Sequence, residues 1–230
     1  MIKAHPWQWR EPRDIPPRQW LYGRHYIRRY LTCTVAPGAT GKSSLCILEG
    51  LSMATGRALV GFKPSSRYRI WYWNGEDPQD ELDRRIAAAC HHHKITPEEL
   101  EGHWFVDSGR SIPMKIARSN NRDGLVLENG AIEQIISTIK ANIIDLLIID
   151  PFIASHQVSE NDNVAVEAVV SAFAAIAEEA NCGVELVHHV RKMNGNEAGV
   201  DDARGASALI AKSRSARVLN VMTEETGKKF

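Results

Sequence analysis

The sequence predicts an α/β protein in which helices cover both faces of a mainly parallel sheet. Three observations predict this fold class. Short apolar segments typical of buried strands alternate with longer segments of helical periodicity. The helical segments are long enough to cross over between parallel strands. A glycine-rich turn separates the first strand of the series from the first helix.

The first strand-turn-helix unit covers residues 30–55. The segment YLTCTVA (30–36) is rich in β-branched residues, and SSLCILEGLSMAT (43–55) has helical periodicity. Between them, VAPGATGKSSL (35–45) matches the Walker A pattern G-x-x-x-x-G-K-[ST], except that Ala36 replaces the first glycine. Alanine is tolerated there unless the backbone φ angle must be positive.

This loop is expected to bind the phosphates of ATP. Backbone amides and a helix N-terminus converge on phosphate oxygens in such loops, while the lysine reaches the outer phosphates and a hydroxyl holds Mg²⁺. We therefore expect Ser43 to bind Mg²⁺. The nucleotide-binding residues are expected to be Gly38, Ala39, Thr40, Gly41, Lys42, Ser43 and Ser44.

The remaining elements follow in alternation. Strands are expected at 68–74, 103–108, 145–150, 183–189 and 215–223, and helices at 77–93, 129–142 and 163–181. The segment 111–130 departs from this alternation, because Asp123-Gly124 predicts a small inserted hairpin.

The strand LLIID ends at Asp150, which is placed to hold Mg²⁺ as a Walker B carboxylate. The next residue is Pro151, where an AAA+ ATPase would carry the glutamate that orients the attacking water. Glu76, at the end of RIWYWNGE, is the candidate for this role. Two alternatives remain: Asp77 is the base, or Glu76 only caps the following helix.

Composition suits a globular protein of 230 residues, with 43% hydrophobic and 24% charged residues. The N-terminus lacks a signal-peptide pattern and no apolar run is long enough to span a membrane, so we expect a cytoplasmic protein without membrane contact. No C-x-x-C spacing occurs, which favours reduced core residues over disulfides or a zinc site. The cysteines are Cys33, Cys46, Cys90 and Cys182.

Residues 1–30 are expected to form a basic, aromatic arm, followed by a core at 31–230. The net charge of the chain is zero, but this arm has seven lysines and arginines against two acidic residues. Its prolines prevent a long helix. Two interpretations stay open. The arm docks on a neighbouring subunit or on DNA, or it is a strap packed on its own domain.

Several motifs in order carry a family resemblance: VAPGATGKSSL, WYWNGEDP, LLIIDPF, ELVHHVRK and DDARGASALI. Together they resemble the RepA-type, RecA-like ATPases, a family that includes hexameric plasmid replicative helicases. The resemblance implies a RecA-like P-loop NTPase fold, ATP and Mg²⁺ as cofactors, a homohexameric ring and single-stranded DNA as a partner. Ala36 departs from the usual pattern of this family.

The resemblance also implies residue roles. Glu76 would be the catalytic carboxylate, and His189, a better match than His188, would sense the γ-phosphate. Arg214 fits the arginine finger best, with Arg204 and Arg217 as alternatives. Structural interpretations stay open for both groups. The histidines would then only be polar residues at a strand end, and the arginines would only form surface ion pairs. The segment 191–205 would contact DNA through residues that include Arg191 and Lys192.

A ring-shaped replicative helicase acting on single-stranded DNA is therefore the expected function. A RecA-like regulatory or recombination accessory ATPase without unwinding activity is one alternative. A small-molecule P-loop kinase is another, although 191–205 has few arginines for a kinase lid. The triplet His91–His93 lies late in a predicted helix, where positive charge favours the helix dipole. Consecutive residues point in different directions around a helix, which disfavours metal binding there.

Overall fold

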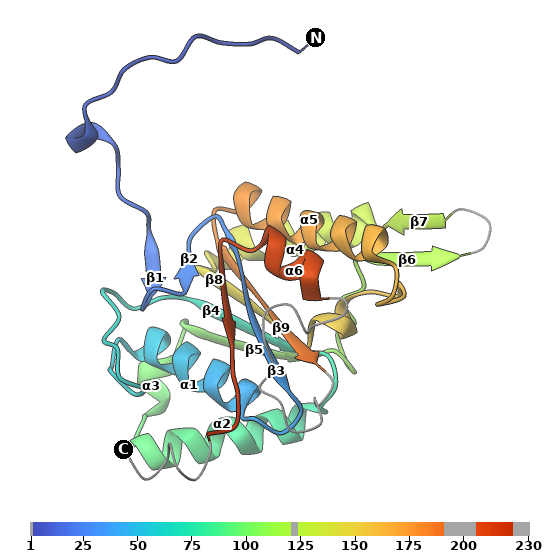
Figure 1. The fold of residues 1–230 in the computed structure, drawn as a ribbon. Coiled ribbons are helices and arrows are strands. Elements are labelled where there is room, and N and C mark those ends of the chain that lie inside the picture. The colour runs from blue at the N-terminus through green and yellow to red at the C-terminus, as the bar shows by residue number, and fades with distance from the viewer. Residues whose placement is uncertain (1, 121–123, 191–205, 223–230) are drawn as a thin grey trace.

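A six-stranded sheet forms the centre of the computed structural model, which describes residues 2–120, 124–190 and 206–222 (Figure 1). The strand order is β10-β3-β9-β8-β4-β5, and every neighbouring pair is parallel. The predicted α/β class is thereby confirmed. The strands are β3 (Leu31–Pro37), β4 (Ile70–Asn74), β5 (Trp104–Ser108), β8 (Leu146–Asp150), β9 (Gly183–Val190) and β10 (Ser215–Val218).

Helices cover both faces of the sheet (Figure 1). One face carries α1 (Lys42–Thr55), α2 (Gln79–His93) and α3 (Pro97–Leu100), and the other carries α4 (Asn129–Asn142), α5 (Asn163–Glu179) and α6 (Ala206–Lys212). Each face has its own hydrophobic core cluster. The four long helices lie close to their predicted ranges, whereas the sequence patterns did not predict α3 or α6.

Helix α5 illustrates how the sequence places an element. Val166, Val169, Val170 and Phe173 are buried and recur at helical spacing, so they form one apolar face directed at the core. Asp162 caps the helix by accepting a hydrogen bond from the backbone nitrogen of Ala165 at 3.0 Å. Helix α5 thereby covers the sheet beside η2 (Phe152–Ser155), the short turn that follows β8.

The predicted hairpin is present as β6 (Ala117–Asn120) and β7 (Gly124–Leu127), paired antiparallel. It lies apart from the central sheet, on the side of α4 and α5 (Figure 1). Gly124 has a φ of 65°, which favours glycine at this position. The insertion therefore leaves the order of the central strands undisturbed.

The N-terminal segment has two parts. Residues 2–19 extend away from the rest of the molecule and include the short turn η1 (Pro12–Asp14) (Figure 1). The next residues form an antiparallel pair of strands, β1 (Trp20–Tyr22) and β2 (Tyr26–Ile27), whose side chains are mostly buried. The boundary predicted at residue 30 lies in the turn between β2 and β3.

Three of the four cysteines, Cys33, Cys46 and Cys182, are buried, as expected for core residues, while Cys90 is partly exposed. Among the described residues, no helix combines the length and apolar character needed to cross a lipid bilayer.

Candidate functional site

A cavity of about 310 Å³ lies where β3, β4, β8 and β9 end. Ligands of parallel α/β sheets commonly bind at this edge, beyond the carboxyl ends of the strands. Most of the predicted site residues meet here, whereas Gly38, Thr40 and Arg214 do not line the cavity. The lining residues are Ala39, Gly41, Lys42, Ser43, Ser44, Asn74, Glu76, Asp77, Arg85, Asp150 and His189.

The phosphate loop keeps its shape without the leading glycine. Ala36 is a buried residue of β3 paired with β9, and it does not have a positive φ angle. The positive φ angles fall on Ala39 and Gly41, at 63° and 87°. Thr40 donates from its hydroxyl to the carbonyl oxygen of Pro37 at 2.8 Å and thereby closes the loop. The departure at Ala36 therefore places no residue in a disfavoured conformation at that position.

Lys42 begins α1, and its ammonium group is held inside the cavity. It donates to the carbonyl oxygen of Pro37 at 3.1 Å and lies 3.0 Å from Nδ1 of His189. Burial lowers the pKa of Lys42, while the charges of Asp150 and Glu76 act in the opposite direction. A phosphate group entering the cavity would meet both this cation and the N-terminus of α1.

The two expected metal ligands, Ser43 and Asp150, both offer oxygen atoms. Both line the cavity, and Asp150 is only 1% exposed. Its Oδ2 accepts a hydrogen bond from the Tyr72 hydroxyl at 2.7 Å, which orients the carboxylate. A hydroxyl and a carboxylate beside a phosphate site suit Mg²⁺, which prefers hard oxygen ligands completed by water and phosphate. These residues therefore fit the ion.

The turn after β4 brings Glu76 and Asp77 to the cavity. Oδ1 of Asn74 accepts from the backbone nitrogens of Glu76 and Asp77, at 3.0 and 2.8 Å. Gly75 allows the chain to pass η2, because a Cβ atom there would lie 2.1 Å from Cβ of Ala154. Close packing at this glycine therefore sets the position of the two carboxylates.

The two carboxylates differ in their partners. Asp77 forms an ion pair with Arg85 at 2.8 Å. Within the described part of the chain, the carboxylate of Glu76 makes no hydrogen bond or ion pair, and the residue is exposed. Glu76 therefore presents a free carboxylate to the cavity, whereas the charge of Asp77 is already neutralised.

The two histidines at the end of β9 point in opposite directions, because side chains alternate along a strand. His189 lines the cavity beside Lys42, and burial together with that cation lowers its pKa. His188 is buried with its ring centroid 6.2 Å from that of Phe152, and burial lowers its pKa to about 4. Of the two histidines, only His189 lines the cavity.

The predicted arginines lie away from the cavity. Arg214 is exposed just before β10, with its guanidinium 4.9 Å from the ring centroid of Tyr30, at the end of the sheet opposite to the cavity. The guanidinium of Arg217 donates hydrogen bonds to both carboxylate oxygens of Glu49, at 2.7 and 2.6 Å, and to the Tyr26 hydroxyl. The other residues with a predicted role, Arg204, Arg191 and Lys192, lie outside the described residues.

Sequence reasoning missed three residues of this site: Tyr72, Asn74 and Arg85. A signal existed for Asn74, because asparagine before glycine at a strand end favours a turn. Tyr72 and Asn74 share one face of β4 by the two-residue period. Arg85 carried no signal, since its role depends on how α2 packs beside the cavity.

Comparisons with known proteins show the family and the fold of the chain. A family model described as an AAA domain matches residues 1–195, a range that includes the phosphate loop, Glu76, Asp150 and His189. The crystal structure of the RadB recombinase is similar in fold, with a TM-score of 0.53 and 14% sequence identity over 84% of this chain and 75% of that chain. No match was found among curated protein sequences. The chain therefore belongs to the AAA-domain family, with the fold of the RecA-like P-loop ATPases.

Proposed function

We propose that the protein is an ATP-hydrolysing RecA-like motor, a ring-forming DNA helicase that acts on single-stranded DNA. The observation that supports hydrolysis is the cavity at the carboxyl edge of the sheet. Lys42, Ser43, Glu76, Asp150 and His189 lie together there although they come from three separate elements, α1, β8 and β9, and from the loop after β4.

Each residue has a role in transferring the γ-phosphoryl group of ATP to water. Lys42 and the loop amides bind the phosphates, and Ser43 and Asp150 hold Mg²⁺. When bound, Mg²⁺ neutralises negative charge on the phosphates. Glu76 orients the attacking water, because its carboxylate is free to accept a hydrogen bond. His189 responds to the γ-phosphate through its contact with Lys42.

The topology supports a motor rather than a passive binder. Strand β9 lies between β3, which leads to the phosphate loop, and β8, which ends at Asp150. His189 is therefore adjacent to both phosphate and metal ligands, and it precedes the segment that the family resemblance assigns to DNA contact. An exposed cation, Arg214, lies at the free edge strand β10. From there it cannot reach its own cavity but is available to a neighbouring subunit.

A recombination accessory ATPase without unwinding activity is the second candidate, and the similarity in fold to the RadB recombinase favours it. ATP turnover measured with and without single-stranded DNA tests the shared part of both proposals, and we expect stimulation. Strand displacement on a forked duplex separates them, since only the helicase unwinds. Native mass with and without ATP and Mg²⁺ tests the ring. A monomer that ignores DNA would exclude both candidates and favour the kinase.

A further inference from the structure

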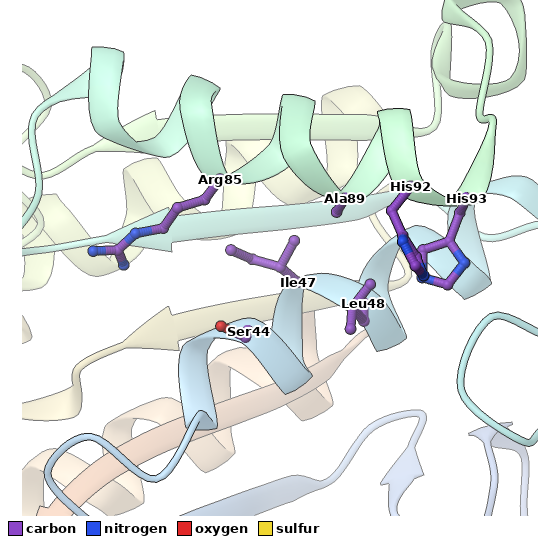
Figure 2. A pocket seen from close by; sticks show the side chains of 7 residues that line it. All are labelled: Ser44, Ile47, Leu48, Arg85, Ala89, His92 and His93. Atoms are coloured by element: carbon purple, nitrogen blue, oxygen red, sulfur yellow. The ribbon is translucent and has the colours of Figure 1, made fainter.

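A second cavity, of about 290 Å³, lies between α1 and α2 (Figure 2). Ile47 and Leu48 of α1 and Ala89 of α2 form its apolar walls. His92 and His93 line its end toward the C-terminus of α2, while Figure 2 shows Arg85 and Ser44 at the opposite end. The cavity is therefore apolar along its length and polar at both ends.

This cavity adjoins the phosphate cavity. Ser44 and Arg85 line both of them, and Ser44 comes two residues after Lys42. A ligand whose charged part lies at the phosphate loop would therefore extend directly along α1 into the second cavity. Each cavity alone is close to the lower limit of about 300 Å³ for small-molecule sites, so one ligand of nucleotide size suits the two together.

The chemistry of the walls suits a nucleoside. A planar base gains from contact with apolar side chains such as Ile47, Leu48 and Ala89, and a few polar groups at the rim then select its edge. The imidazoles of His92 and His93 meet edge to face, with centroids 4.7 Å apart. Neither ring hydrogen-bonds to another described side chain, so their nitrogens are free for a ligand.

We propose that the α1–α2 cavity binds the base and ribose of the nucleotide, with His92 and His93 reading the polar edge of the base. This assignment rests on the proposed binding of phosphates at Lys42. It gives His92 and His93 a role in base selection and makes the apolar face of α1 part of the substrate site.

The test compares Mg-ADP with Mg-pyrophosphate, which carries the phosphates without the nucleoside, by calorimetric titration. We expect the wild-type protein to bind ADP at least about tenfold more tightly, a difference of about 1.4 kcal/mol. Ala89→Phe fills the cavity, so ADP should bind only as well as pyrophosphate while pyrophosphate binding stays unchanged. Ala87→Phe, the same change at an exposed position of α2, should behave as wild type.

Photolabelling of the wild-type protein with 2-azido-ADP locates the base without relying on a variant. Trypsin cleaves after Lys42, Arg57, Arg85 and Lys94, so we expect the label on peptides 43–57 and 86–94. Label confined to other peptides, or equal affinity of wild type for ADP and pyrophosphate, would overturn this assignment. Failure of wild type to bind either ligand would instead refute the phosphate site itself.

Discussion

The Tyr72 hydroxyl donates a hydrogen bond of 2.7 Å to Oδ2 of Asp150, and both side chains are buried. The same hydroxyl accepts from the side-chain amide of Asn74 at 3.3 Å. Burial and the charge of Asp150 raise the pKa of Tyr72 well above its ordinary value, so the phenol stays protonated and donates. Tyr72 therefore links the proposed metal ligand to the residue that shapes the turn at Glu76.

Removing this hydroxyl should weaken the metal site. In Tyr72→Phe, the Mg²⁺ concentration needed for half-maximal ATPase activity should rise by about tenfold, the lower end of the effect of losing a partner behind a metal ligand. Turnover at saturating Mg²⁺ should fall much less. Tyr22→Phe is the control, because its hydroxyl bonds the carbonyl of Phe62 away from the cavity. An unchanged Mg²⁺ requirement in Tyr72→Phe would mean that this bond is only structural.

Lys42→Ala should abolish binding of Mg-ATP, because it removes the cation held closest to the proposed phosphate positions. Isothermal titration calorimetry measures the loss directly. Because Lys42 also contacts His189, thermal unfolding of the variant must show that the fold survives. If Lys42→Ala bound the nucleotide as tightly as wild type does, the proposed mechanism would be wrong.

Glu76→Gln should bind ATP but turn it over about 10²-fold more slowly or worse, the scale expected for losing a positioned general base. Asp77→Asn is the matched control, since it changes the neighbouring carboxylate that is already paired with Arg85. Steady-state turnover and ATP affinity are measured for both. The assignment fails if Asp77→Asn is inactive while Glu76→Gln turns over normally.

Arg214→Ala should bind ATP about as well as wild type but lose hydrolysis, because an arginine finger acts mainly on charge that develops in the transition state. Mixing it with Glu76→Gln, each inactive alone, should restore part of the ATPase activity. Some interfaces then pair an intact Glu76 with an intact Arg214 of the next subunit. If native mass shows co-assembly without recovery, Arg214 does not act between subunits, and Arg204 becomes the candidate, because Arg217 is bound to Glu49.

The fold should lose stability in mild acid. Burial lowers the pKa of His156 to about 4, from an ordinary value near 6.5. Between pH 6.5 and 4, His156 is protonated in the unfolded chain but neutral in the folded protein. The free energy of unfolding therefore decreases as pH falls. Between pH 7.5 and pH 5, His156 alone lowers the free energy of unfolding by about 2 kcal/mol. Urea unfolding should show a decrease that is about 2 kcal/mol larger in wild type and in the control His91→Gln than in His156→Gln. The variant keeps a smaller decrease, because the buried His188, whose pKa is also lowered to about 4, is still present. An equal decrease in all three proteins would contradict this account.

Local patterns predicted the elements well. Helical periodicity located α1, α2, α4 and α5, and continuous apolar runs located the buried strands, because burial of one helix face or of a whole strand leaves its period in the sequence. The positions of the phosphate loop and of Asp150 in the fold were also predictable, since the residues of the loop are adjacent in the chain and Asp150 ends a recognisable strand. The N-terminal segment was not predictable as two parts, because only packing distinguishes the buried Tyr26 from the exposed Trp7.

The sequence by itself determined the fold class, the phosphate loop and the set of candidate carboxylates, histidines and arginines. Tertiary structure alone decided which of these charged side chains are already paired with an opposite charge. Arg85 from α2 neutralises Asp77 and leaves Glu76 unpaired, and Glu49 binds Arg217 across 168 positions of sequence. The pairing of a charge depends on neighbours in space, and the strand order sets those neighbours. No pattern within a short stretch of residues contains that information.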